Sequence, residues 1–144
     1  MEIFEILKTT NSIKSRAGQL EELRKHSDNM ALRFILQGAY DDRISSYLPE
    51  GAPPFEPFVA TADKPPASLN FQEKVIFNFF KFTLGSKEPI LKQERAFIEL
   101  LESVDPEDAD VLIRMKDKTI HEKYRRLTKA LIKEFLAPWV PDFV

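Results

Sequence analysis

Hydrophobic residues recur along this chain mostly at the intervals of an α-helix. The clearest stripe repeats every three and four residues, the spacing of one helix face, and comprises Leu32, Ile35, Leu36, Ala39 and Tyr40. Glycine numbers only 4, and Leu, Lys, Glu and Arg are frequent, which also favours helix over strand. The pattern predicts an all-α fold, a single bundle of about six to seven helices.

Polar clusters and capping residues bound the expected helices. The Ser27–Asn29 cluster ends one helix and supplies a cap for the next. Asn70 followed by Glu73 is typical of a capping box, and Asp105-Pro106 is a strong start signal. Helices are therefore expected over about residues 3–8 and 15–26, after the cap at 27–29 through the stripe at 32–40, over 70–85 and 88–103, from 105 onward, and over 119–136.

The expected helix at 70–85 is the most hydrophobic of the set. It carries five of the chain's twelve phenylalanines, together with Val75 and Ile76. This apolar surface is too wide for a helix that shows one face to water. We therefore expect this helix at the centre of the bundle.

A proline-rich segment at 43–69 interrupts the helical pattern. It holds six of the ten prolines, and proline lacks the amide donor that a continuous helix needs. Phe55, Phe58 and Val59 lie within it, so we expect it to fold over the core rather than to act as a free linker. The 144 residues then form one helical domain with opening helices at 1–42, the proline-rich excursion at 43–69, a helical core at 70–137 and an apolar tail at 138–144.

Composition excludes several classes of chemistry. Cysteine is absent, which excludes disulfides, thiolate nucleophiles and cysteine zinc sites, and two histidines are too few for a histidine metal cage. Four glycines cannot be assembled into a phosphate-binding loop. No apolar run approaches the roughly 20 residues of a membrane span. We expect a cytoplasmic protein that is not an enzyme and has no cofactor and no metal.

The charges are strongly segregated near the C-terminus, although the net charge of the chain is only −2. Residues 96–113 contain six acidic side chains and no Lys or Arg. Residues 114–133 contain eight Lys or Arg against Asp117 and Glu122. In a continuous helix at 119–136, Arg126, Lys129 and Lys133 would lie opposite a buried face of Ile120, Tyr124, Leu127, Leu131 and Phe135.

Such a cationic stripe can follow the phosphates of a nucleic acid. Two interpretations stay open: a phosphate-binding surface, and an ordinary solvated helix face. Under the first, the candidate nucleic-acid-binding residues are Lys14, Arg16, Lys116, Lys118, Arg125, Arg126, Lys129 and Lys133. The acidic residues of 99–110 are explained by helix capping and by the helix dipole rather than by a metal.

The tail Ala137–Val144 also has two interpretations. It either packs back onto the bundle or presents Trp139 and Phe143 to a protein partner. Buried aromatic anchors are the residues that dominate protein interfaces.

Short pieces spread over nearly the whole chain carry a likeness to a known family. They are Ile3–Leu7, Leu20–Lys25, Ser27–Leu32, Ala39-Tyr40, the aromatic run Phe77–Leu84, Glu107–Met115 and Ala137–Pro141. In this order they resemble the helical N-terminal DNA-binding domain of the T4-type phage ATP-dependent DNA ligases, and the chain also resembles small tailed-phage proteins. The ligase Lys-x-Asp-Gly nucleophile is missing, because the chain has no Asp-Gly dipeptide. The family's small-residue turn is replaced by Lys116–His121.

The resemblance implies a stand-alone, non-catalytic module that binds double-stranded DNA through the phosphate backbone, in an infected host cell if the chain is phage-derived. The alternative is an adaptor or inhibitor that acts on a replication or transcription protein through the tail or the acidic surface. Binding of phosphates should weaken steeply with salt, whereas docking of an apolar tail should hardly respond.

Overall fold

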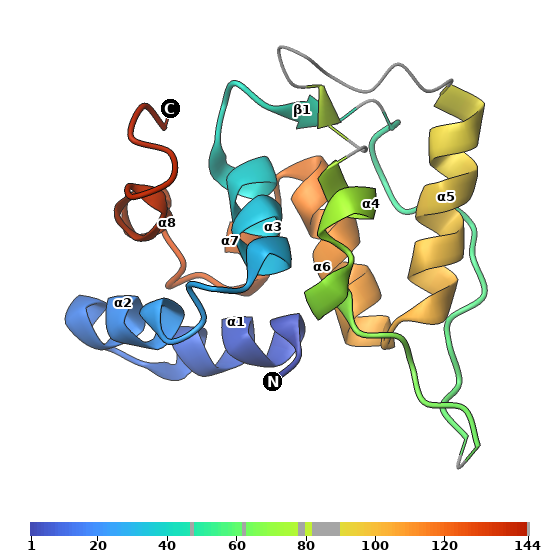
Figure 1. The fold of residues 1–144 in the computed structure, drawn as a ribbon, viewed down its shortest axis with the longest axis horizontal. Coiled ribbons are helices and arrows are strands. Elements are labelled where there is room, and N and C mark those ends of the chain that lie inside the picture. The colour runs from blue at the N-terminus through green and yellow to red at the C-terminus, as the bar shows by residue number, and fades with distance from the viewer. Residues whose placement is uncertain (47, 62, 78–79, 82–89, 144) are drawn as a thin grey trace.

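The structure is a computed structural model that describes residues 1–46, 48–61, 63–77, 80–81 and 90–143 (Figure 1). Within these residues the chain is mostly helical, which confirms the all-α prediction. The helices are α1 (Ile3–Ser12), α2 (Arg16–Arg24), α3 (Met30–Tyr40), the 3-10 turn η1 (Leu69–Phe71), α4 (Glu73–Phe77), α5 (Ile90–Ser103), α6 (Pro106–Asp117), α7 (Ile120–Lys123) and α8 (Lys129–Leu136). Two short strands, β1 (Ser45–Ser46) and β2 (Phe80–Lys81), pair antiparallel.

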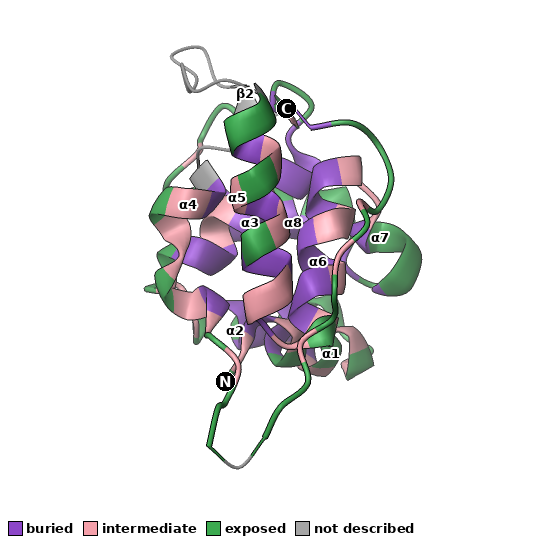
Figure 2. Ribbon diagram, turned by 90° about the vertical axis from the view of Figure 1, so that its right-hand side faces the viewer, coloured by how far each residue is buried: buried purple, intermediate pink, exposed green. Residues whose placement is uncertain are grey.

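Helix α3 lies at the centre of the described bundle. It packs against α4, α6 and α8, while α5 lies on the far side of α6 (Figure 1). Its predicted stripe is buried along its whole length, and the buried residues of α6 and α8 form one continuous core with it (Figure 2). The central helix is therefore the one with the clearest hydrophobic periodicity.

Side-chain caps set several helix starts as the sequence predicts. The Asn29 carboxamide oxygen accepts from the Leu32 N–H at 3.0 Å, and Asp105 caps α6 through the Glu107 N–H at 2.8 Å. Helix α1, by contrast, runs four residues beyond the predicted end at Lys8. The Thr10 hydroxyl donates to the Ile6 carbonyl at 2.8 Å, so it bonds to the helix's own backbone instead of ending it.

The prediction of a long central helix over 70–85 is wrong for the described residues. Helix α4 ends at Phe77, and Phe80–Lys81 form strand β2 instead. Phe71 is 82% exposed, although Ile76 is fully buried. Phe80 and Lys81 pair with Ser46 and Ser45, so their backbone groups find partners in a distant segment rather than within a helix. Residues 82–85 lie outside the described part of the chain.

The predicted continuous helix over 119–136 is also wrong. Tyr124 leaves the helical conformation with φ −111° and ψ 73°, and Thr128 starts α8 by capping the Leu131 N–H. Between them, the Arg126 N–H donates to the Asn11 side chain of α1 at 2.9 Å. The five predicted face residues are nevertheless all buried, because the break turns the chain without moving them out of the core.

The proline-rich segment follows the surface of the bundle without a regular helix, as predicted. Phe55 packs partly against the core, and the Glu56 N–H donates to Glu102 of α5 at 2.7 Å. Phe58 is half-buried, whereas the next residue, Val59, is 80% exposed. The segment is therefore attached to the bundle at some points and directed towards solvent at others.

Candidate functional site

The structure brings the two predicted groups of cations together. The Arg16 guanidinium of α2 reaches α8, where it donates to the Ala130 carbonyl and pairs with Glu134 at 2.8 Å. The Arg126 backbone and side chain both bond to Asn11, close to Lys14 in the chain. The basic face is defined here as the surface formed by Lys14, Arg16, Lys118, Arg125, Arg126, Lys129 and Lys133.

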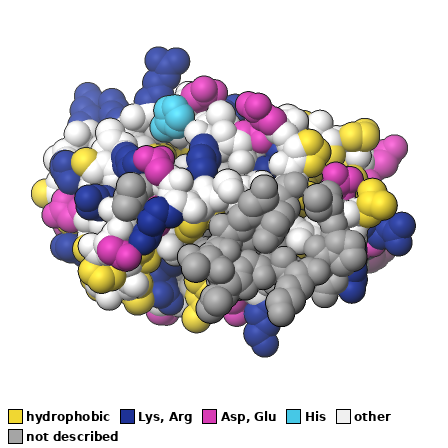
Figure 3. Space-filling view, turned by 90° about the horizontal axis from the view of Figure 1, so that it is seen from above, with side chains coloured by type: hydrophobic (Ala, Val, Ile, Leu, Met, Phe, Trp, Pro, Cys, Tyr) yellow, Lys and Arg dark blue, Asp and Glu magenta, His cyan; other side chains and the backbone are white. Residues whose placement is uncertain are grey.

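Some side chains of the basic face already form bonds within the protein, and others do not. Arg126 and Arg16 hold segments of the chain together, whereas Lys14, Arg125 and Lys133 are exposed and have no ion pair within the described residues. Figure 3 shows Lys and Arg side chains gathered with a histidine at the end of the molecule that holds α2 and α8 in Figure 1. These free cations can form charge-assisted hydrogen bonds with an anion.

The basic face contains a recess of about 450 Å³, called the basic pocket below. It is lined by Ala39, Tyr40, Asp42, Lys118, His121, Arg125, Thr128 and Lys129. The Tyr40 hydroxyl donates to the Leu127 carbonyl at 2.6 Å, which ties the end of α3 to the segment before α8. The Lys129 ammonium is 2.5 Å from the Asp42 carboxylate, which is the one acidic group among the described residues that line the recess.

Lys118 lines the basic pocket and also bonds to the end of α3. It has a left-handed backbone conformation with φ 59°, which an L-residue other than glycine adopts at a cost. Its ammonium donates to the Gly38 and Asp41 carbonyls, both at 2.9 Å, and so satisfies groups at the C-terminal end of α3. Burial holds the pKa of Lys118 below its ordinary value, because the charged form loses water.

Lys116 was predicted to bind phosphate, but its ammonium is already bonded inside the protein. Its side chain is only 3% exposed, and its ammonium donates to the Pro49 carbonyl, the Gly51 carbonyl and the Asp117 carboxylate. An ammonium has three donors, and all three are used. Lys116 therefore anchors the proline-rich segment to α6 and is not available to a nucleic acid.

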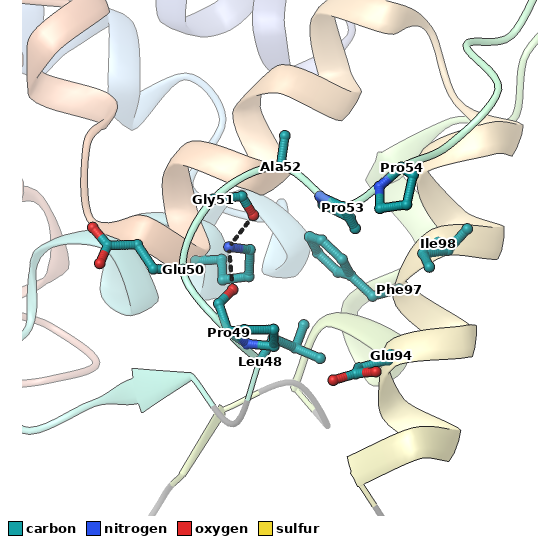
Figure 4. A pocket seen from close by; sticks show the side chains of 11 residues that line it. Leu48, Pro49, Glu50, Gly51, Ala52, Pro53, Pro54, Glu94, Phe97 and Ile98 are labelled. Atoms are coloured by element: carbon teal, nitrogen blue, oxygen red, sulfur yellow. Dashed lines mark hydrogen bonds between the residues drawn. The ribbon is translucent and has the colours of Figure 1, made fainter.

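This anchoring creates a second recess of about 380 Å³, called the proline-walled pocket below (Figure 4). Its walls are Leu48–Pro54, the α5 residues Glu94, Phe97 and Ile98, and Lys116. Sequence reasoning missed it, because the residues come from three separate segments that only the fold brings together. The cluster of prolines marked one wall of the pocket, but the sequence did not indicate which residues would lie opposite it.

Most acidic side chains of the predicted acidic surface at 99–110 already have bonding partners within the protein. Glu107 pairs with Lys8 at 2.7 Å, and Asp110 pairs with both Arg114 and Lys123. Asp108, one of the acidic residues assigned to helix capping and the helix dipole, is fully buried and accepts from the Phe4 N–H at 3.0 Å. Burial, together with the nearby carboxylates of Glu2, Asp105 and Glu5, raises its pKa to about 7, although the bond from the Phe4 N–H lowers it. Within the described residues no group of three or more acidic or histidine side chains could hold a metal ion.

The C-terminal tail packs back onto the bundle. Phe143 is 2% exposed and belongs to the core, so it is not presented to a partner as one interpretation required. Trp139 is 42% exposed, and it contacts Phe135 edge to face while the Arg33 guanidinium lies 4.5 Å above its ring. The tail is therefore part of the folded domain.

None of the described helices has the length and apolar character needed to cross a membrane. No curated protein and no solved structure matches the chain. The resemblance to the ligase domain therefore stays a prediction. A family profile matches residues 6–122, which include every residue that lines the proline-walled pocket but not Arg125, Lys129 or Lys133. On this match the chain belongs to DUF6433, a family of unknown function.

Proposed function

We propose that the protein is a non-catalytic DNA-binding module that contacts the phosphate backbone of double-stranded DNA through the basic face. The observation that carries this proposal is the basic pocket, where Lys118, Arg125 and Lys129 line one recess, and the exposed Lys133 follows Lys129 by about one turn of α8. Its chemistry suits phosphate, because cations from separate segments can each donate to a different phosphate oxygen.

The distribution of charge supports a local rather than a global interaction. The whole chain carries a net charge of −2, so unspecific attraction to DNA over the entire surface is weak. Much of the acidic segment that precedes the basic face in sequence is paired with other cations. Binding should accordingly depend on a few residues of the basic face and weaken as salt rises.

The test reverses the two cations that have no internal partner. Arg125→Glu combined with Lys133→Glu should reduce the affinity for a labelled 20-base-pair duplex by at least tenfold, because phosphate contacts become repulsions. The slope of log K against log salt should fall by about two units, one for each lost phosphate contact. Fluorescence anisotropy at several salt concentrations measures both quantities.

Arg95→Glu combined with Lys64→Glu is the matched control. It makes the same change in net charge at two exposed cations on α5 and in the proline-rich segment, away from the basic face. The control should bind with a nearly unchanged salt slope. Equal loss of affinity in both double variants, or no DNA binding by the wild-type protein at low salt, would contradict the proposal.

A further inference from the structure

The proline-walled pocket has the size and lining of a small-molecule site. Known sites are mostly apolar recesses of about 300–1,000 Å³ with a few polar groups that fix the orientation of the ligand. Here Leu48, Phe97, Ile98 and three prolines provide the apolar walls of a recess of about 380 Å³. Figure 4 shows the loop of residues 48–54 facing α5 across this space.

The loop wall is fixed before any ligand arrives. The Lys116 ammonium holds the Pro49 and Gly51 carbonyls at 2.9 Å each, and the Gly51 N–H donates in turn to the Asp117 carboxylate at 3.1 Å. Gly51 has φ 92°, a conformation that favours glycine and allows the loop to turn back at this point. A ligand therefore enters a preformed recess and need not order the loop.

The charges on the walls select the kind of ligand. Lys116 has no donor left for an anion, because its three hydrogens are already used. Glu94 is half-buried at the α5 wall and has no hydrogen bond or ion pair within the described residues. In Figure 4 the Glu94 side chain lies on the α5 side of the recess, as Phe97 does, whereas Glu50 points away from the recess. The free charge at the pocket is therefore negative.

We infer that the proline-walled pocket binds a small organic cation in which an aromatic or branched apolar group is joined to an ammonium. The apolar group lies against Phe97, Ile98 and the prolines, where it loses contact with water. The ammonium pairs with the Glu94 carboxylate at the rim. This site is independent of the basic face, which attracts ligands of the opposite charge.

The test uses three probes with the same phenyl ring and two-carbon chain. These are phenethylammonium, 2-phenylethanol and 3-phenylpropanoate, titrated against the labelled protein by two-dimensional NMR. Phenethylammonium should bind about fivefold tighter than the alcohol, the effect of one partly exposed ion pair of about 1 kcal/mol, and the carboxylate should bind weakest. Shifted signals should come from residues 48–54, 94–98 and 116.

Glu94→Gln and Glu99→Gln separate the specific contact from general attraction. Both remove one negative charge from α5, but only Glu94 lines the pocket. Glu94→Gln should reduce the preference for phenethylammonium over 2-phenylethanol to about one, while Glu99→Gln should keep it. The inference is overturned if the wild-type protein shows no such preference, if the two variants behave alike, or if the shifted residues lie elsewhere.

Discussion

Lys116 and Lys118 are two residues apart at the end of α6, yet they belong to different pockets and do different work. Lys116 is buried and saturated by two carbonyls and a carboxylate of the proline-rich segment and α6. Lys118 follows the helix end in a left-handed conformation, bonds two carbonyls of α3 and lines a recess with other cations. A shift of two residues at a helix end thus separates an anchoring lysine from one beside a candidate ligand site.

The comparison shows that lysine can act as a structural connector as well as a surface charge. Each ammonium binds carbonyls from a segment more than sixty residues away in the chain. Irregular segments and the C-terminal ends of helices leave backbone carbonyls unbonded, and a long flexible side chain can reach and satisfy them. The contribution of each lysine to stability, and that of one buried carboxyl without a cation, can be measured by substitution.

The largest effect is expected for Lys116→Met. The apolar chain of methionine fills the same space, but the Asp117 carboxylate and two carbonyls lose their partner in a site that water hardly reaches. Removing one member of a buried ion pair costs about 3 kcal/mol of unfolding free energy. Urea denaturation measures this loss, and Lys133→Met, at an exposed site, should change stability by less than about 0.5 kcal/mol. If the Lys116→Met protein is as stable as the wild type, Lys116 does not anchor the proline-rich segment.

A smaller, pH-dependent effect is expected for Asp108, a buried carboxyl with no cation beside it. Its pKa is about 7 in the folded protein and lower in the unfolded chain, so the folded state binds more protons between pH 4 and 7. Stability should therefore be highest below about pH 4 for this group and fall as the pH rises through 7.

Asp108→Asn removes that dependence, because the amide is neutral at every pH. Relative to the wild type, the variant should gain on the order of 2 kcal/mol between pH 4 and pH 8, measured by urea denaturation at each pH. Asp117→Asn is the contrasting control, because it weakens the partner of Lys116 and should destabilise at both pH values. If the difference in unfolding free energy between Asp108→Asn and the wild type does not change with pH, the pKa of Asp108 is not raised in the folded protein.

The smallest effect is expected at Lys118, where two substitutions separate its two features. Lys118→Met loses the bonds to Gly38 and Asp41 but keeps the strained backbone, which should cost about 1–2 kcal/mol. Lys118→Gly loses the same bonds and relieves the left-handed strain, so it should recover about 1 kcal/mol of that loss. Thermal unfolding of both variants gives the difference. If glycine is no better than methionine, backbone strain at residue 118 is negligible.

The sequence predicted the fold well wherever a local signal dictated the structure. The α3 stripe and the Asn29 and Asp105 caps act within one or two helical turns, and all are present as predicted. The failures share a cause that is not local. Beyond the end of α4, strand β2 pairs with the distant residues Ser45–Ser46. In the break between α7 and α8, the backbone N–H of Arg126 donates to the side chain of Asn11.

For the candidate sites, sequence reasoning found the charges but not their partners. It selected eight cations, of which the structure leaves Lys14, Arg125 and Lys133 exposed without an internal bond in the described residues. It did not find the proline-walled pocket or the burial of Asp108, because each depends on contacts between segments distant in the chain.

The sequence alone thus determined the helical class, the buried stripe of α3 and most helix starts, because periodicity and capping are short-range effects. Tertiary structure alone decided which charged residues remain free. A lysine at 116 or 118 has the same intrinsic chemistry, and its role depends on which unbonded carbonyls the folded chain brings within reach of its ammonium. The packing of distant segments sets the distance between each ammonium and these carbonyls, and no local sequence pattern encodes it.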